Sequence, residues 1–297
     1  MNRSHASHIR TSPSHGGNRR GLSKQAFTLV ELLVVISILA ILGGLTFGGL
    51  ANSTRRGKAD TTRFMVSKLS DAILDYYEDY EDLAGTMSLT ALRQRMREEL
   101  PDSWQDVAPS GNVPAATTAA GRAYSSYKTG ASSSYASAEC LYMIITHSGL
   151  FPDFLQDIRP EQVGDIDNDG KKEFWDGWKR PIAFFRWAPG FSAPYSLLQI
   201  PDPTDHHDPL DTKDEDTNAF ALYPLIYSAG PDEALNDPSS SGPDGYGLVT
   251  AATGWPNSAL ASPSTFKAGG SDLVGSPKPD NPTAYRDNIT NHQLIAQ

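Results

Sequence analysis

The chain has 297 residues, a formal net charge of −10 at pH 7 and a single cysteine, Cys140. Its acidity argues against nucleic acid as a main partner, because binding to phosphates needs basic residues, and one cysteine excludes an intramolecular disulfide. With 25 glycines and 21 prolines, a chain of this length permits one globular head with long loops rather than two large domains.

The first 51 residues divide into two segments of opposite character. Residues 1–26 contain no acidic residue and show no apolar periodicity, which predicts a disordered leader. Residues 27–51 are mostly apolar and carry one charge, Glu31. At about 1.5 Å of rise per residue, a helix of this length spans a bilayer core of roughly 30 Å. We predict a transmembrane helix over 27–51, and a carboxylate so costly in lipid indicates a function for Glu31.

The junction between these segments resembles the signal of type IV pilins and type II secretion pseudopilins. Lys24-Gln25-Ala26-Phe27-Thr28-Leu29-Val30-Glu31 carries the resemblance, with Ala26 standing where the family usually has glycine. The resemblance implies that prepilin peptidase cuts between Ala26 and Phe27 and that the new amino terminus is methylated. It also implies an inner-membrane protein with a cytoplasmic leader and a periplasmic head, which would then enter a periplasmic pseudopilus by polymerisation through the 27–51 helix.

Residues 52–104 are predicted to continue the long helix and then form a second one. Apolar residues recur at helical spacing to about residue 83 and so share one face, which should pack on the head: Met65, Leu69, Ile73, Tyr76, Tyr80 and Leu83. Gly85 is expected to end this helix. Ser88 then reads as the N-cap of a second helix that runs to about Leu100.

The remainder is predicted to be a low-complexity surface insertion at 105–136 followed by the globular head, 137–297. The head should begin with an apolar helix at about 137–146 and continue with short strands at 172–175, 181–187, 195–200 and 220–227. The acidic run 201–218 is expected to be a solvated loop. The end of the chain, from residue 239, is expected to be an irregular tail. The predicted fold class is α+β: a long N-terminal helix packed on a small, mainly antiparallel sheet.

An acidic segment in the head has the spacing of a calcium loop. Oxygen ligands fall at positions 1, 3, 5, 7, 9 and 12, with Gly170 at position 6 for the turn; they are Asp165, Asp167, Asp169, the carbonyl of Lys171, Glu173 and Asp176. We expect calcium here. The alternative is an acidic surface turn that precedes a strand.

Two further segments resemble parts of the major pseudopilins. Asp176-Gly177-Trp178-Lys179-Arg180-Pro181 is similar to their Asp-x-Trp-Gly-x-Pro segment, with Lys179 at the usual glycine position. Tyr227-Ser228-Ala229-Gly230-Pro231-Asp232 is similar to their Ser-x-Gly-x-Asp turn, which precedes a calcium-binding loop. The resemblance therefore implies a second calcium site, with candidate ligands Asp232, Asp237 and Asp244.

The sequence favours a structural subunit and not an enzyme, because it has no nucleophile elbow, no His-Glu-x-x-His and no phosphate-binding glycine loop. We expect a pseudopilin whose partners are prepilin peptidase, other pseudopilin subunits and an inner-membrane assembly platform. Pairing of Glu31 with the amine of Phe27 on a neighbouring chain would drive assembly. The alternatives are a subunit of a type IV or competence pilus and a membrane-tethered binding module.

Overall fold

The computed structural model describes residues 28–107, 115–131, 135–188, 190–191, 194–196, 198–199, 208–213, 223–231, 248, 274–277 and 286–295. The chain divides into two compact units, Met1–Ala51 and Asn52–Gln297. Helix α1, Leu29–Ala84, contributes residues to both.

In the first unit, α1 presents apolar side chains that no other described part of the unit covers. Eleven large apolar residues between positions 29 and 42 are exposed: Leu29, Val30, Leu32, Leu33, Val34, Val35, Ile36, Ile38, Leu39, Ile41 and Leu42. Within the described ranges, no helix combines the length and the apolar character needed to cross a membrane. The transmembrane segment over 27–51 stays a prediction.

In the second unit, α1 buries the face that the sequence predicted. Met65, Leu69, Ile73 and Tyr80 are buried, together with Val66, in the main core. The helix ends at Ala84, and α2 follows as Leu89–Glu99. Ser88 caps α2, since its hydroxyl oxygen accepts a hydrogen bond from the Ala91 N–H at 3.3 Å. The predicted end of α1 at Gly85 and the predicted start of α2 after Ser88 are both confirmed.

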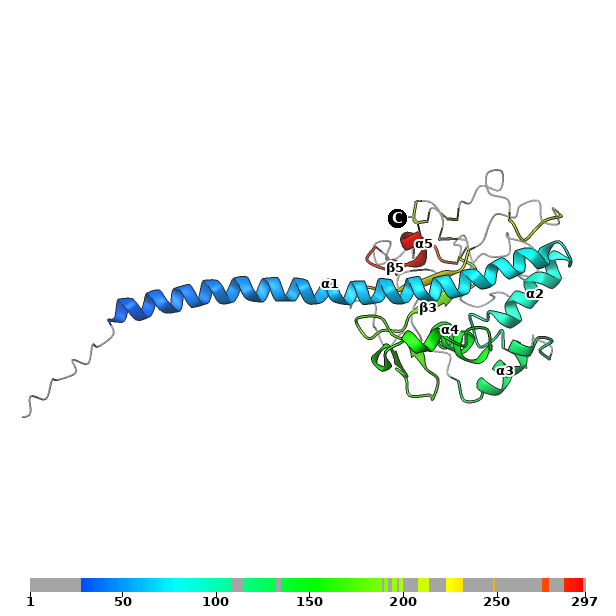
Figure 1. Ribbon diagram of the computed structural model, residues 1–297, viewed down its shortest axis with the longest axis horizontal. Coiled ribbons are helices and arrows are strands. Elements are labelled where there is room, and N and C mark those ends of the chain that lie inside the picture. Colours follow the sequence, from blue (N-terminus) through cyan, green and yellow to red (C-terminus); the bar gives the residue numbers. More distant parts are fainter. Residues whose placement is uncertain are drawn as a thin grey trace, which may run out of the picture. The chain divides into compact units, whose positions relative to one another are not determined.

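The strands form two small antiparallel sheets, which confirms the α+β class. Strands β1 (Val163–Gly164) and β2 (Glu173–Phe174) pair with each other. Strands β3 (Ala183–Phe185), β4 (Leu225–Ser228) and β5 (Ile289–Thr290) pair in that order, with Phe184 opposite Ile226. Helix α4, Ala136–His147, contacts β2 and β3. The second unit's part of α1 runs past the sheet that contains β3 (Figure 1).

The larger sheet is buried on both faces. Alternate side chains of a strand point to opposite sides of the sheet, so neighbouring residues join different apolar clusters. Phe184, Ile226 and Ile289 belong to the main core with α1 and α4. Phe185 and Tyr227, their neighbours in the chain, belong to a second apolar cluster whose members include Phe191, Leu248 and Val274. Because both faces are covered, the sequences of these strands are continuous apolar runs and do not alternate with polar residues.

Parts of the predicted insertion are packed into the head. Residues Ala119–Tyr127 form helix α3, which contacts α2 and α4. Tyr124 is fully buried, and its hydroxyl donates to the Glu99 carbonyl at 3.1 Å. A side chain at Gly121 would meet Ala116 and Thr118, in the turn that leads into α3.

The end of the chain is also more ordered than predicted, since β5 and α5 (Asn291–Ile295) lie within the expected irregular tail. The side chain of Asn291 anchors them: its Oδ1 accepts from the Ile226 N–H at 3.0 Å, and its Nδ2 donates to the Pro224 carbonyl at 2.9 Å. The strand predicted at 195–200 is wrong for the described residues 195, 196, 198 and 199, none of which lies in a strand. Two 3-10 helices, η1 (Phe154–Asp157) and η2 (Pro160–Gln162), precede β1.

The acidic run 201–218 is only partly described, and its described residues, 208–213, are partly buried instead of fully solvated. Asp208 and Asp211 are buried. Asp208 lies 3.5 Å from the guanidinium of Arg93, which is itself buried on α2. A buried cation on α2 thus explains why this part of the run folds onto the head.

Candidate functional sites

The start of α1 is a capping box that the sequence analysis did not anticipate. Both the N–H and the hydroxyl of Thr28 donate to the Glu31 carboxylate at 2.9 Å, and the Glu31 N–H donates to the Thr28 hydroxyl oxygen at 3.2 Å. The Ser/Thr-x-x-Glu pattern was the available signal. Glu31 therefore has a local structural role. Ala26 and Phe27, the predicted processing residues, lie outside the described part of the chain.

The predicted calcium loop connects β1 to β2 and has the geometry of a tight turn. Asn168 and Gly170 have φ values of 59° and 89°. The Gly170 N–H donates to Asp165 Oδ2 at 2.9 Å, and the Lys171 N–H donates to Asp169 Oδ1 at 2.7 Å. Carboxylate oxygens of Asp165, Asp167 and Asp169 lie within 4.8 Å of one another. The loop brings together the first three predicted ligands.

A second group of carboxylates adjoins the first and includes a residue that the sequence analysis missed. Oxygens of Glu139, Asp167 and Glu173 also lie within 4.8 Å of one another, so Asp167 belongs to both groups. Glu173 lies on β2, whereas Glu139 comes from α4; both are fully buried. A single carboxylate inside the apolar run 138–145 was the sequence signal for Glu139. The spacing of residues along the sequence does not indicate that Glu139 lies near Asp167 and Glu173.

Three of these carboxylates accept hydrogen bonds through only one of their two oxygens. Glu139 Oε2 accepts from the Trp104 indole N–H, Asp165 Oδ2 accepts from Gly170, and Glu173 Oε2 accepts from the Ile166 N–H at 3.3 Å. Their other oxygens, Glu139 Oε1, Asp165 Oδ1 and Glu173 Oε1, are buried and accept no hydrogen bond from the described residues. Buried acceptors of this kind are costly unless a donor or a cation satisfies them.

The pKa values of the two glutamates reflect this environment. Burial raises the pKa of Glu139 to about 7, and the hydrogen bond from Trp104 offsets only part of the effect. Burial likewise raises the pKa of Glu173 to about 8, with Trp175 opposing the shift and Glu139 adding to it. Burial and mutual repulsion thus disfavour the charged forms. A bound cation would reverse this preference.

The other predicted ligands are placed differently. Asp176 lies apart from the carboxylate groups: its Oδ1 accepts from the Trp178 and Arg180 N–H groups at 2.7 and 2.9 Å, and its Oδ2 accepts from the Ser228 hydroxyl at 2.7 Å. The side chain of Lys171 points to Tyr127, with its ammonium 4.5 Å from the ring centre. The three candidate ligands of the second calcium site, Asp232, Asp237 and Asp244, lie outside the described residues.

The two segments that resemble pseudopilins contact each other. Besides the bond between Ser228 and Asp176, the Arg180 guanidinium donates to the Gly230 carbonyl at 3.2 Å. Lys179, at the position where glycine is usual, has a φ of 67°, which lies in the region that glycine adopts most readily. The Gly177 N–H donates to the Thr62 hydroxyl oxygen at 2.9 Å and thereby joins this turn to α1.

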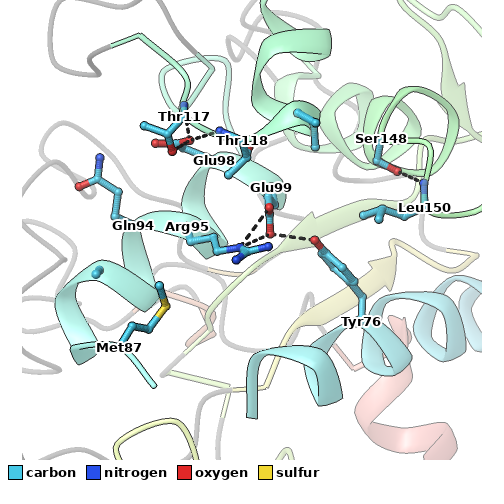
Figure 2. A pocket seen from close by; sticks show the side chains of 13 residues that line it. Tyr76, Met87, Gln94, Arg95, Glu98, Glu99, Thr117, Thr118, Ser148 and Leu150 are labelled. Carbon is cyan, nitrogen blue, oxygen red and sulfur yellow. Dashed lines mark hydrogen bonds and ion pairs between the residues drawn. The ribbon is translucent and has the colours of Figure 1, made fainter. Parts of the chain in front are cut away.

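A pocket of about 690 Å³ lies between α1, α2 and α3. Figure 2 shows that its polar side chains bond to each other: Glu99 accepts from Arg95 at 3.2 Å and from the Tyr76 hydroxyl at 2.7 Å. Glu98 Oε2 accepts from the Thr117 N–H at 2.9 Å. The charged groups of this cleft, Arg95, Glu98 and Glu99, therefore already have partners within its wall.

The comparisons with known proteins concern the start of the chain. The family model described as "Prokaryotic N-terminal methylation motif" matches residues 22–47. No curated protein and no solved structure matches the chain. The matched residues include the capping box and the predicted cleavage junction.

Proposed function

We propose that this protein is a pseudopilin, a structural subunit of a type II secretion-type pseudopilus. It is made as a prepilin, cut by prepilin peptidase between Ala26 and Phe27, and assembled through its N-terminal apolar helix. The observation that carries the proposal is the methylation motif at residues 22–47, which overlaps a helix whose apolar side chains are exposed. In the proposed filament, neighbouring subunits cover these side chains, and before assembly lipid covers them.

Glu31 supplies the proposed driving force for assembly. Its carboxylate lies among exposed apolar side chains such as Val30 and Leu32, and in lipid such a charge is unfavourable. The positive amine of Phe27 on a neighbouring chain would relieve this penalty in the filament. The capping box supplies a competing explanation for Glu31, namely that it only starts the helix.

Two variants separate these explanations. Glu31→Gln removes the charge but keeps an acceptor that suits the capping box; Thr28→Ala removes the cap but keeps the charge. We expect Glu31→Gln to insert and be processed normally but to assemble poorly, and Thr28→Ala to assemble. Filament yield after shearing, with processing followed by mass spectrometry for methylated Phe27, measures both. If Glu31→Gln assembles like the wild type while Thr28→Ala does not, the charge mechanism is wrong. An intact leader would refute processing altogether and favour a membrane-tethered binding module.

The choice of pseudopilin over a type IV or competence pilin is supported by the paired segments around Asp176 and Ser228. Both resemble major pseudopilin segments, and they bond to each other at the end of β4. A deletion strain tests this choice: we expect loss of a secreted protein from the medium. Loss of surface pili or of DNA uptake, with secretion intact, would favour the pilin alternatives. The inner-membrane platform is the expected assembly partner, and the head is expected to be periplasmic.

A further inference from the structure

We propose that a calcium ion binds between helix α4 and the β1–β2 loop, with the buried carboxylates of Glu139 and Glu173 and the loop carboxylates of Asp165 and Asp167 as ligands. This site differs from the linear loop that the sequence predicts, because it adds Glu139 of α4 and leaves out Asp169, the Lys171 carbonyl and Asp176. It also lies in a different segment from the predicted site at Asp232, Asp237 and Asp244. It does not depend on whether the protein is a pseudopilin.

The ligand set is made of oxygen atoms only, which is the preference of calcium. The two groups of oxygens, each within 4.8 Å, share Asp167 and so adjoin each other. Four carboxylates, each able to bind through one or two oxygens, can provide most of the six to eight ligands that calcium takes. No described lysine or arginine forms an ion pair with Glu139, Asp165 or Glu173.

The buried unpartnered oxygens distinguish this cluster from an ordinary acidic surface. Glu139 and Glu173 are both 0 % exposed, and one oxygen of each accepts no hydrogen bond from the described residues. The opposite oxygen of each is fixed by a donor: the indole of Trp104 for Glu139, and the backbone of Ile166 for Glu173. Carboxylates that bind a metal are commonly oriented in this way, with a hydrogen-bond donor on one oxygen and the other oxygen free to bind the metal.

The proposed ion connects three parts of the head. Glu139 lies on α4, Glu173 lies on β2, and Trp104 follows α2 in the chain. Calcium would hold the hairpin loop against α4 and satisfy buried acceptors that otherwise oppose folding. We therefore expect the head to gain stability when calcium is added.

The test uses the full-length protein in detergent after removal of metals. Terbium serves as a luminescent substitute for calcium, because Trp104 and Trp175 contact the proposed ligands and can sensitise its emission. We expect tryptophan-sensitised terbium emission that calcium displaces, and a rise in the melting temperature with calcium that magnesium reproduces weakly. Glu139→Gln and Glu173→Gln should each lower calcium affinity at least tenfold.

The matched control is Glu161→Gln, which changes an exposed acid close to the loop and should bind calcium like the wild type. Folding is checked on the metal-free proteins: removing a buried charge should leave the melting temperature of the Glu139→Gln variant equal to or above that of the wild type. If that variant does not fold, the test relies on Glu173→Gln and on weaker terbium emission in Trp104→Phe, in which Trp175 still sensitises the ion. Absence of any calcium effect on the wild type, or wild-type affinity in the Glu139→Gln variant, overturns the proposal.

Discussion

Arg186 and Asp106 form an ion pair in the interior of the head: Arg186 Nη1 donates to Asp106 Oδ2 at 3.1 Å, and both side chains are buried. Arg186 follows β3, whereas Asp106 follows α2. The same guanidinium donates to the Leu100 carbonyl at 2.9 Å, and the Tyr77 hydroxyl of α1 donates to the Arg186 carbonyl at 2.8 Å. Burial raises the pKa of Asp106, but Arg186 and Arg97 outweigh it and hold that pKa below its usual value. This network joins the sheet to both helices.

The first prediction concerns Arg186. Arg186→Met should destabilise the head by about 3–5 kcal/mol, because it leaves Asp106 and Asp102 buried with less compensating charge. Urea unfolding of the full chain, followed by circular dichroism, measures the change. Adding Asp106→Asn should cost less in the Arg186→Met background than in the wild type. Additive costs would show that the two side chains do not interact.

The second prediction concerns the hydroxyl of Tyr80, which donates to Glu99 Oε2 at 2.9 Å in a buried position. Tyr80→Phe should cost about 1–3 kcal/mol, since it removes a hydrogen bond to a charged group. Tyr142→Phe is the control, because the Tyr142 hydroxyl forms no hydrogen bond within the described residues. Equal free energies of unfolding for the two variants would contradict the prediction.

The third prediction concerns pH. His292 is buried between Ser196 and Pro224, with Nε2 3.1 Å from the Pro224 carbonyl and Nδ1 2.8 Å from the Ser196 hydroxyl. Burial lowers the pKa of His292 to about 4, and the bond to Pro224 offsets only part of this shift. The unfolded chain, with a histidine pKa near 6.5, therefore binds a proton that the folded chain does not.

The stability that neutral His292 provides should be complete above about pH 6.5 and should be lost as the pH falls toward 4, by up to about 3 kcal/mol. Urea unfolding at several pH values should show a shallower acid dependence for His292→Gln than for the wild type. His147→Gln, at an exposed histidine on α4 whose pKa is also lowered by desolvation and by Lys171, should change the slope less than His292→Gln does. Identical slopes for all three proteins would count against the assignment.

The fourth prediction concerns Gly230, whose φ is 68° and whose missing Cβ would lie 2.0 Å from the Asp287 carbonyl oxygen. Gly230→Ala should destabilise the head by about 1–3 kcal/mol, because it adds backbone strain and displaces the segment that leads into β5. Gly57→Ala, on an open face of α1, should be neutral or stabilise by up to about 1 kcal/mol. Thermal unfolding of both variants provides the comparison, and a shift of the same sign in both would refute it.

The sequence by itself determined the features that depend on neighbours a few residues apart. These are the apolar segment with its methylation signal, the face of α1 that carries Met65 and Leu69, the end of α1 before Gly85, the N-cap at Ser88, and the tight turn of the 165–170 loop. Each follows from helical periodicity, capping or turn chemistry, which act locally.

Only the tertiary structure decided which distant groups meet. It placed Glu139 of α4 against Glu173 of β2, directed Asp176 to Ser228 instead of to the loop, and paired Arg186 with Asp106. It also placed Asn291 and His292 of α5 against β4 and the preceding Pro224. Spacing along the chain carries no information on these contacts, because they arise when packing removes water from groups that must then find partners.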